Sequence, residues 1–128
     1  MDDKLRKFTI EFLASGKHKL TPEKFLTMSD VVFLDVRTKE EFETLNFNFK
    51  YYNNIETINI PLNELPDRFG ELPKNKSIAI WCPGNFRSSM AYTYLLSKDY
   101  ENSYILIGGF SELGNNLKAG GLFKVINR

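Results

Sequence analysis

The residues most suited to chemistry are Cys82, the single cysteine of the chain, and Arg87, five positions later. The apolar run Ser77–Trp81 before the cysteine predicts a strand, and Ser88–Ser97 after the arginine predicts a helix. A thiol between the end of a strand and the start of a helix meets free backbone N–H groups and the positive end of the helix dipole. The guanidinium adds a fixed positive charge. This arrangement favours the thiolate, which is the nucleophilic form of cysteine.

The four residues between the cysteine and the arginine are suited to hold an anion. Gly84 and Asn85 are the residue types that most readily adopt a positive φ, which a tight loop needs if its amides are to converge on one point. Pro83 contributes no amide donor. A structural alternative is a buried Cys82 at a strand end and a solvated Arg87 at a helix start. The full sequence of strand, cysteine, Gly-Asn loop, arginine and helix favours a reactive site.

Strand and helix patterns alternate along the chain, which indicates an α/β domain. The predicted strands are Val31–Leu34, Thr57–Ile60, Ser77–Trp81 and Tyr104–Ile107. The predicted helices are about Asp3–Ser15, a short one begun by Thr21 and Pro22, one capped by Thr38, a short one at Asn63–Phe69, Ser88–Ser97 and Phe110–Lys118. We expect a central parallel sheet with helices on both faces, in three layers, and reactive groups at the carboxyl ends of the strands.

A chain of 128 residues has the size of one domain. We expect residues 1–17 to form an N-terminal helical extension and residues 18–128 to form the domain. In the extension, apolar side chains recur at helical spacing and Gly16 ends the helix. Packing on the domain and contact with a second copy are alternative roles for it. His18 is expected to be an exposed loop residue.

Composition excludes several classes of protein. Seventeen basic against sixteen acidic residues leave a formal charge of +1, which gives no electrostatic basis for binding nucleic acid or an anionic membrane. One cysteine and one histidine exclude an internal disulfide and a Cys/His zinc site. No apolar run approaches the ~20 residues of a membrane helix, and the N-terminus lacks the pattern of a secretory signal. We expect a cytoplasmic protein without a metal or other cofactor, with Cys82 as a free thiol.

Several motifs, in order, resemble those of the rhodanese family of sulfurtransferases. The matches are Leu34–Arg37 followed by Glu40-Glu41-Phe42 for D-V-R-x-x-x-E-[FY], Ile58–Leu62 followed by Leu65 for A-I-N-I-P-L-x-x-L, Cys82–Arg87 followed by Ser88 for C-x-x-x-x-R-S, and Ile107–Phe110 for L-x-G-G. Lys118-Ala119-Gly120 is similar to the end of the family pattern. The resemblance covers about residues 19–126.

The resemblance implies that Cys82 takes a sulfane sulfur from a donor such as thiosulfate or a persulfide. It then passes this sulfur to cyanide or a thiol, including the thiol of a partner protein. The same resemblance implies a substrate site formed by Pro83, Gly84, Asn85, Phe86, Arg87 and Ser88, with the amides from Gly84 to Ser88 holding the persulfide or the donor's anionic group. For Asp35 and Arg37, a second anion site and a structural ion pair are alternatives, and the ion pair is favoured.

The sequence departs from the family pattern in three places. Gly84 and Asn85 stand where the family commonly has Ser or Thr and then Gly, and a common tryptophan is missing near Gly114. The longer segment Asn46–Glu56 replaces the turn G-H-I-P-G, and its aromatic residues predict a lid, a partner-docking patch or core packing.

Two other functions remain on the same scaffold. The first is a cysteine-dependent phosphatase or arsenate reductase, although related phosphatases have one more residue between the cysteine and the arginine. The second is a non-catalytic binding module, which the presence of both Cys82 and Arg87 disfavours.

Overall fold

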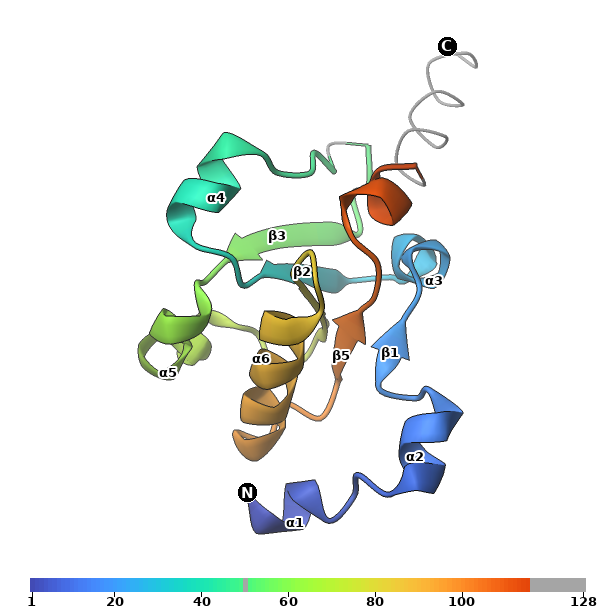
Figure 1. Cartoon of the computed structure of the whole chain (residues 1–128). Helices are drawn as coiled ribbons and strands as arrows, with labels where there is room; N and C mark the ends of the chain where they lie inside the picture. Colours follow the sequence, from blue (N-terminus) through green and yellow to red (C-terminus); the bar gives the residue numbers. More distant parts are fainter. Residues whose placement is uncertain (50, 116–128) are drawn as a thin grey trace.

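The computed structural model of the chain describes residues 1–49 and 51–115. Within these residues a parallel sheet of five strands has the order β1-β5-β4-β2-β3 (Figure 1). The strands are β1 (Lys19–Leu20), β2 (Val31–Asp35), β3 (Ile55–Asn59), β4 (Ser77–Trp81) and β5 (Ser103–Leu106). The inner strand β2 pairs along its whole length with both β3 and β4. The predicted α/β class with a central parallel sheet is confirmed.

The named helices are α1 (Asp2–Leu5), α2 (Ile10–Ser15), α3 (Pro22–Thr27), α4 (Lys39–Thr44), α5 (Leu65–Arg68) between the 3-10 turns η1 (Leu62–Glu64) and η2 (Phe69–Glu71), and α6 (Phe86–Ser97). Thr21 and Thr38 cap α3 and α4 through their hydroxyl groups, as predicted. A further helical segment begins at Phe110 and extends to residue 115. The rest of the last predicted helix, with Lys118-Ala119-Gly120, lies outside the described residues.

Alternate residues of the strands enter two separate cores, one on each face of the sheet. The first core contains Leu34 and Ile80, packed among side chains of α5 and α6 such as Leu65 and Leu95. The second core contains Val31, Phe33, Ala79 and Trp81, with Phe25 of α3 and Leu113 of the last helical segment. Helices therefore cover both faces of the sheet, which confirms the three predicted layers (Figure 1).

The aromatic segment after α4 packs into the second core. Phe49 is buried, and its ring centroid lies 5.0 Å from that of Phe33. The ring of Phe47 lies 5.2 Å from Trp81 and 5.4 Å from Phe110. Of the three interpretations of this segment, the structure supports core packing for these two rings.

The N-terminal extension differs from the single predicted helix. Thr9 adopts an extended conformation, and its hydroxyl accepts a hydrogen bond from the Phe12 amide, so that α2 begins anew after it. A hydroxyl that competes for a backbone amide explains the break. Phe8 still packs on the domain, with its ring 6.0 Å from Tyr92, and Lys4 forms an ion pair with Glu101. The extension contacts the domain, while its boundary at residue 17 stays a prediction.

His18 lies in the turn before β1, as predicted, but the prediction that it is exposed is wrong. Its side chain is only 7% exposed and lies between the rings of Phe12 and Tyr92. The His18 carbonyl accepts a hydrogen bond from the Ile105 amide, at the start of the pairing between β1 and β5. Burial, together with the charge of Lys19, lowers the pKa of His18. A strand of two residues has no periodic pattern, so the sequence did not indicate it.

The packing of α6 leads to a test of the first core. Leu95→Ala should lower the free energy of unfolding by about 2–5 kcal/mol, because it removes a side chain that is completely buried. Leu5→Ala, at a position 51% exposed, is the matched control and should change it by less than about 1 kcal/mol. Urea unfolding of the three proteins measures both changes. Equal losses in the two variants would contradict the assignment of Leu95 to the core.

Candidate active site

Cys82 follows the last residue of β4 and lies beneath the start of α6, as predicted. The side chain is 1% exposed. The backbone N–H of Ser88 donates a hydrogen bond to Sγ at 3.2 Å, and the Ser88 hydroxyl oxygen lies 3.4 Å from the same sulfur. The amide donates to the sulfur and stabilises negative charge on it, whereas the hydroxyl oxygen accepts a hydrogen bond from the thiol. The sulfur is therefore within hydrogen-bond reach of two groups of Ser88 at the start of α6.

The loop between Cys82 and α6 partly matches its predicted conformation. Asn85, with φ of 64°, has the predicted left-handed conformation, whereas Gly84 does not have a positive φ. One left-handed residue is enough to turn the chain into α6, which begins directly at Phe86. Among the described residues, Ser88 is the member of the predicted amide cradle that donates to the sulfur.

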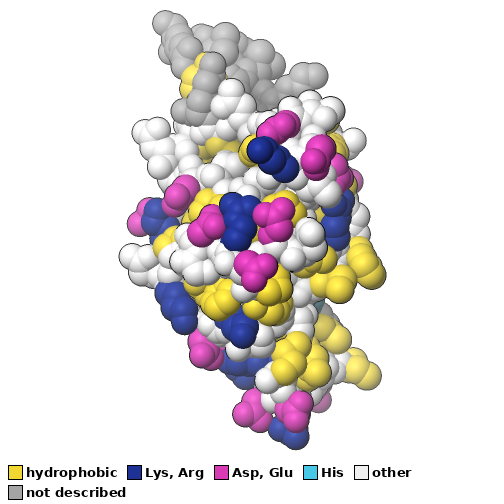
Figure 2. Space-filling model, turned by 90° about the vertical axis from the view of Figure 1, so that its left-hand side faces the viewer, with side chains coloured by type: hydrophobic (Ala, Val, Ile, Leu, Met, Phe, Trp, Pro, Cys, Tyr) yellow, Lys and Arg dark blue, Asp and Glu magenta, His cyan; other side chains and the backbone are white. Residues whose placement is uncertain are grey.

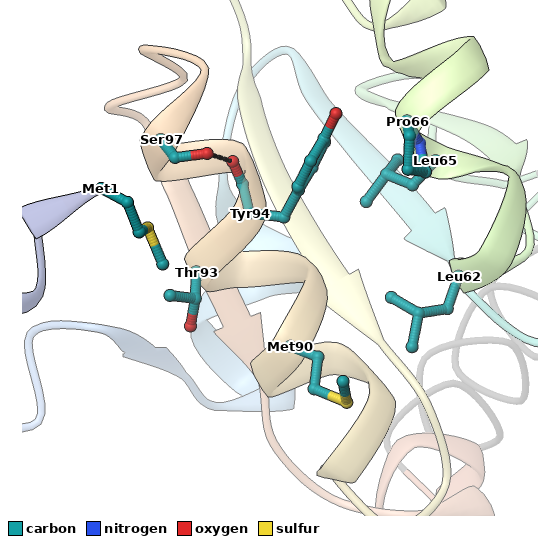
Figure 3. Close-up of a pocket in the computed structure, with 8 residues that line it drawn as sticks. All are labelled: Met1, Leu62, Leu65, Pro66, Met90, Thr93, Tyr94 and Ser97. Carbon is teal, nitrogen blue, oxygen red and sulfur yellow. Dashed lines mark hydrogen bonds between the residues drawn. The ribbon is translucent and has the colours of Figure 1, made fainter.

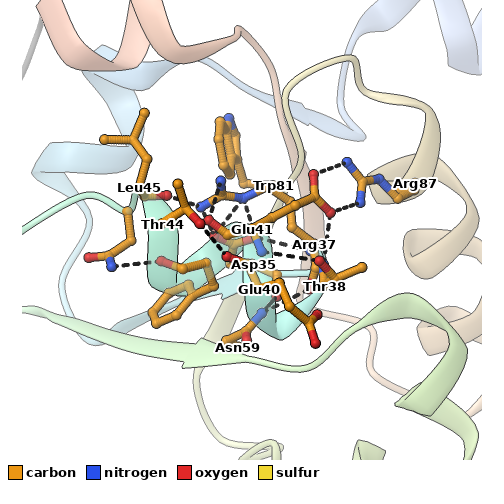
Figure 4. Close-up of polar contacts among 12 residues, drawn as sticks. Asp35, Arg37, Thr38, Glu40, Glu41, Thr44, Leu45, Asn59, Trp81 and Arg87 are labelled. Atoms are coloured by element: carbon orange, nitrogen blue, oxygen red, sulfur yellow. Dashed lines mark hydrogen bonds and ion pairs between the residues drawn. The ribbon is translucent and has the colours of Figure 1, made fainter.

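Arg87 forms an ion pair with a residue that the sequence analysis did not assign to the site. Its two terminal nitrogens donate to the two carboxylate oxygens of Glu41, at 2.7 Å and 3.1 Å. Figure 4 shows this forked contact between α6 and α4. The contact, together with hydrogen bonds from Thr38, holds the pKa of Glu41 at about 2. The Glu41 carboxylate, 46 positions from Arg87 in the chain, therefore compensates the positive charge of Arg87 that was predicted to act on Cys82.

Glu41 is also fixed from within its own helix. Its amide donates to the Thr38 hydroxyl at 3.1 Å, and its carboxylate accepts from the Thr38 amide at 3.0 Å. These reciprocal bonds form a capping box at the start of α4. The pattern Thr38-x-x-Glu41 was visible in the sequence, but it indicated a helix start and not a contact with Arg87.

Asp35 and Arg37 form a buried ion pair at the end of β2. The side chains are 1% and 3% exposed, and Arg37 Nη2 donates to the Asp35 carboxylate at 2.7 Å. The same nitrogen donates to the Leu45 carbonyl at 2.8 Å, and the guanidinium lies 5.0 Å from the centre of the Trp81 ring (Figure 4). With its donors used in this way, Arg37 fixes the strand-to-helix turn, which supports the structural alternative.

A cleft of about 390 Å³ lies next to the reactive loop. It is lined by Pro83 and Phe110 on one side and by residues of the β2–α4 turn and α4 on the other: Arg37, Glu40, Glu41, Thr44 and Leu45. Pro83 is the chain neighbour of Cys82, although Cys82 itself is not among the lining residues. On the face of the molecule shown in Figure 2, acidic and basic side chains are interspersed with apolar ones.

A larger, apolar groove of about 540 Å³ lies between α5 and α6 (Figure 3). It is lined by Met1, Leu62, Leu65, Pro66, Met90, Thr93, Tyr94 and Ser97. None of these side chains is charged, and neither Cys82 nor Arg87 is among them. The candidate site is therefore the reactive loop and not this larger groove.

The described residues contain no group of three or more His, Cys, Asp or Glu side chains placed to hold a metal ion. Within the same part of the chain, no helix has the length and apolar character needed to cross a membrane.

Comparison with known proteins agrees with the fold and the loop. Residues 21–116 match the sequence profile of the rhodanese-like domain. The chain belongs to the rhodanese-like family. This match includes β2, α4, β4, the loop and α6, which are the elements that build the site.

Two curated relatives and one solved structure illustrate the similarity. The tRNA uridine(34) hydroxylase of Cytophaga hutchinsonii is 33% identical over 106 residues, which cover 78% of this chain and 32% of the hydroxylase. The tRNA sulfurtransferase of Blochmanniella pennsylvanica is 38% identical over 80 residues, 62% of this chain and 16% of that protein. An NAD-dependent persulfide reductase from A. fulgidus has a TM-score of 0.57 and 30% identity, over 77% of this chain and 16% of the reductase. The rhodanese-like chain thus spans less than a third of each of these proteins.

The lowered pKa of Glu41 makes the stability of the domain depend on pH. A carboxyl that titrates near 2 when folded and near its ordinary 4.5 when unfolded stabilises the fold above pH ~4.5, and this contribution is lost as the pH falls toward 2. Between pH 5 and pH 2, the wild type should therefore lose more stability than Glu41→Gln. Urea midpoints across this range measure the difference, with Glu43→Gln as the control on the same helix. Parallel curves for wild type and Glu41→Gln would exclude the ion pair with Arg87 in solution.

Proposed function

We propose that this rhodanese-like domain is a sulfurtransferase that carries a sulfane sulfur as a persulfide on Cys82. The observation that supports the proposal most strongly is the position of the thiol at the end of β4, with the Ser88 amide 3.2 Å from Sγ. A fixed donor at this distance stabilises the thiolate before and after each transfer. The donor is a persulfide or thiosulfate, and the acceptor is a thiol, including that of a partner protein, or cyanide.

The proposed reaction has two displacements at sulfur. In the first, the Cys82 thiolate attacks the outer sulfur of the donor, a new S–S bond forms, and the donor's own S–S bond breaks. The donor leaves with that electron pair as sulfite or a thiolate. In the second, the acceptor attacks the outer sulfur of the Cys82 persulfide, and the Cys82 thiolate is regenerated. The two steps involve no net change in the oxidation state of the protein.

The buried thiol suits a persulfide carrier. In a persulfide the reactive outer atom lies one S–S bond, about 2 Å, beyond Sγ. The inner sulfur remains beneath the start of α6, next to the Ser88 amide. Only the outer sulfur has to meet an acceptor. A reducing setting such as the cytoplasm would keep the thiol free between transfers.

The names of two relatives support this chemistry, since one is called a tRNA sulfurtransferase and the other a persulfide reductase. The name tRNA uridine(34) hydroxylase belongs to a protein of which this chain spans 32%. We take sulfur transfer, and not hydroxylation, as the activity of this domain because Cys82 offers a nucleophile at the end of β4.

The contacts of Arg87 disfavour a phosphatase or arsenate reductase. A tetrahedral dianion needs a free guanidinium fork, and here both terminal nitrogens of Arg87 donate to Glu41. Four residues separate Cys82 from Arg87, one fewer than in related phosphatases. The position of the Cys82 thiol at the end of β4 likewise disfavours a non-catalytic binding module.

Sulfur loading tests the proposal directly. Incubation with a persulfide donor should add about one sulfur mass (~32 Da) to the wild-type protein, since Cys82 is its one thiol. Cys82→Ser should gain none, and aryl phosphates should not be hydrolysed by either protein. Intact-protein mass spectrometry and a phosphate-release assay measure these outcomes. The same mass gain in Cys82→Ser would refute the assignment of Cys82.

Discharge of the persulfide should require an acceptor from outside the chain. No second cysteine is present to attack the outer sulfur, so an internal disulfide cannot form. After removal of excess donor, the added mass should persist in buffer and disappear when cyanide or reduced glutathione is supplied. Rapid loss in buffer without an added nucleophile would contradict this mechanism.

A further inference from the structure

A small pocket lies between the N-terminal extension and the domain, and the imidazole of His18 is part of its lining. We propose that this pocket is a binding site for a small, neutral aromatic molecule that donates a hydrogen bond to His18, such as a phenol. The pocket has a volume of about 200 Å³. Neither Cys82 nor Arg87 lines it, so the inference goes beyond the proposed function and does not rest on it.

The walls of the His18 pocket are apolar and come from both parts of the chain. Phe8 and Leu13 belong to the extension, Tyr92 to α6 and Ile105 to β5. The rings of Phe8 and Tyr92 lie 6.0 Å apart. An apolar cavity of about 150 Å³ is large enough to hold benzene. A pocket of about 200 Å³ therefore has room for one six-membered ring with a substituent.

His18 is the polar residue of the pocket that lacks a partner. Its side chain is 7% exposed, and the Nδ1 atom has no hydrogen-bond partner among the described residues. Such atoms are rare, because a buried polar atom loses the hydrogen bonds that water would give it. Burial and the charge of Lys19 lower the pKa of His18, so the imidazole is neutral at pH 7. A neutral imidazole has one nitrogen that accepts a hydrogen bond.

The two hydroxyl groups of the pocket can also act only as acceptors toward a ligand. Ser89 Oγ donates its hydrogen to the Asn85 carbonyl at 2.6 Å, and Thr93 Oγ1 donates its hydrogen to the Ser89 carbonyl at 2.9 Å. Each hydroxyl has a single hydrogen, so the oxygen lone pairs remain for a ligand.

These features define the chemical class of the ligand. The polar groups that line the pocket offer acceptors, so the ligand has to bring the hydrogen-bond donor. Among the described residues, none of the lining side chains is an acid, a lysine or an arginine, so a charged ligand would lose its hydration without compensation. The apolar walls favour a ring. Neutral phenols and indoles have all three properties.

Phenol and toluene test the predicted hydrogen bond. The two molecules have nearly the same shape, but only phenol carries a hydroxyl donor. His18→Phe replaces the imidazole by an apolar ring, so the ratio of the phenol to the toluene association constant should fall about fivefold or more relative to the wild type. Met90→Ala alters the groove between α5 and α6 and not this pocket, so it should leave the ratio unchanged. NMR chemical-shift titrations at neutral pH measure the constants.

Intermolecular nuclear Overhauser effects locate the bound phenol in the wild type, and this measurement does not depend on the folding of His18→Phe. Phenol protons should show effects to the methyl groups of Leu13 and Ile105, which line the pocket. Effects to the Met90 methyl group instead, or the absence of any shift with phenol, would overturn the proposal. Equal ratios in the wild type and His18→Phe would also overturn it, since the ligand would then form no hydrogen bond with His18.

Discussion

The parallel pairing of β2 with β4 is the constraint on which the site depends. In this register Asp35 lies opposite Trp81, and the Val36 amide donates to the Trp81 carbonyl at 3.2 Å. Both strands end at the same edge of the sheet because they run in the same direction. The turn after β2 is thereby placed beside the loop after β4, and α4 meets the start of α6.

Charge at this edge is arranged in pairs, and the two pairs have different physical roles. The buried pair of Asp35 and Arg37 is satisfied on all sides, so removal of one partner would leave an uncompensated charge inside the protein. The pair of Glu41 and Arg87 is partly exposed and joins two helices from distant parts of the chain. It gives the loop a fixed shape and at the same time removes the free positive charge that an anion-binding loop would use. The same contact therefore affects both the shape and the charge of the loop that follows Cys82.

The two cores, one on each face of the sheet, separate Cys82 from the aromatic segment that follows α4. Cys82 belongs to the core beneath α5 and α6, whereas the neighbouring Trp81 belongs to the core formed with α3 and the aromatic segment. Phe47 packs against the Trp81 ring beneath Arg37, and Phe49 packs against Phe33 in the same core. A longer segment than the common family turn thus contributes packing behind the site.

The sequence by itself predicted the features that depend on residues close to one another in the chain. Apolar runs fix the four longer strands, and hydroxyl residues fix the starts of α3 and α4, because each signal acts within a few residues. The placement of Cys82 between a strand and a helix, and the pairing of Asp35 with Arg37 two positions later, are local in the same sense. Asn85 could adopt its left-handed conformation for the same reason.

Only the tertiary structure decided the contacts between distant segments. The strand β1 and the burial of His18 depend on pairing with β5, which no local pattern encodes. Glu41 and Arg87 are 46 positions apart, so their ion pair exists only because β2 and β4 are adjacent and parallel. The sequence by itself placed the cation of Arg87 near the thiol, but only the fold brought in the compensating carboxylate of Glu41. The physical reason is that the charge balance of a site depends on every side chain that packing brings to it.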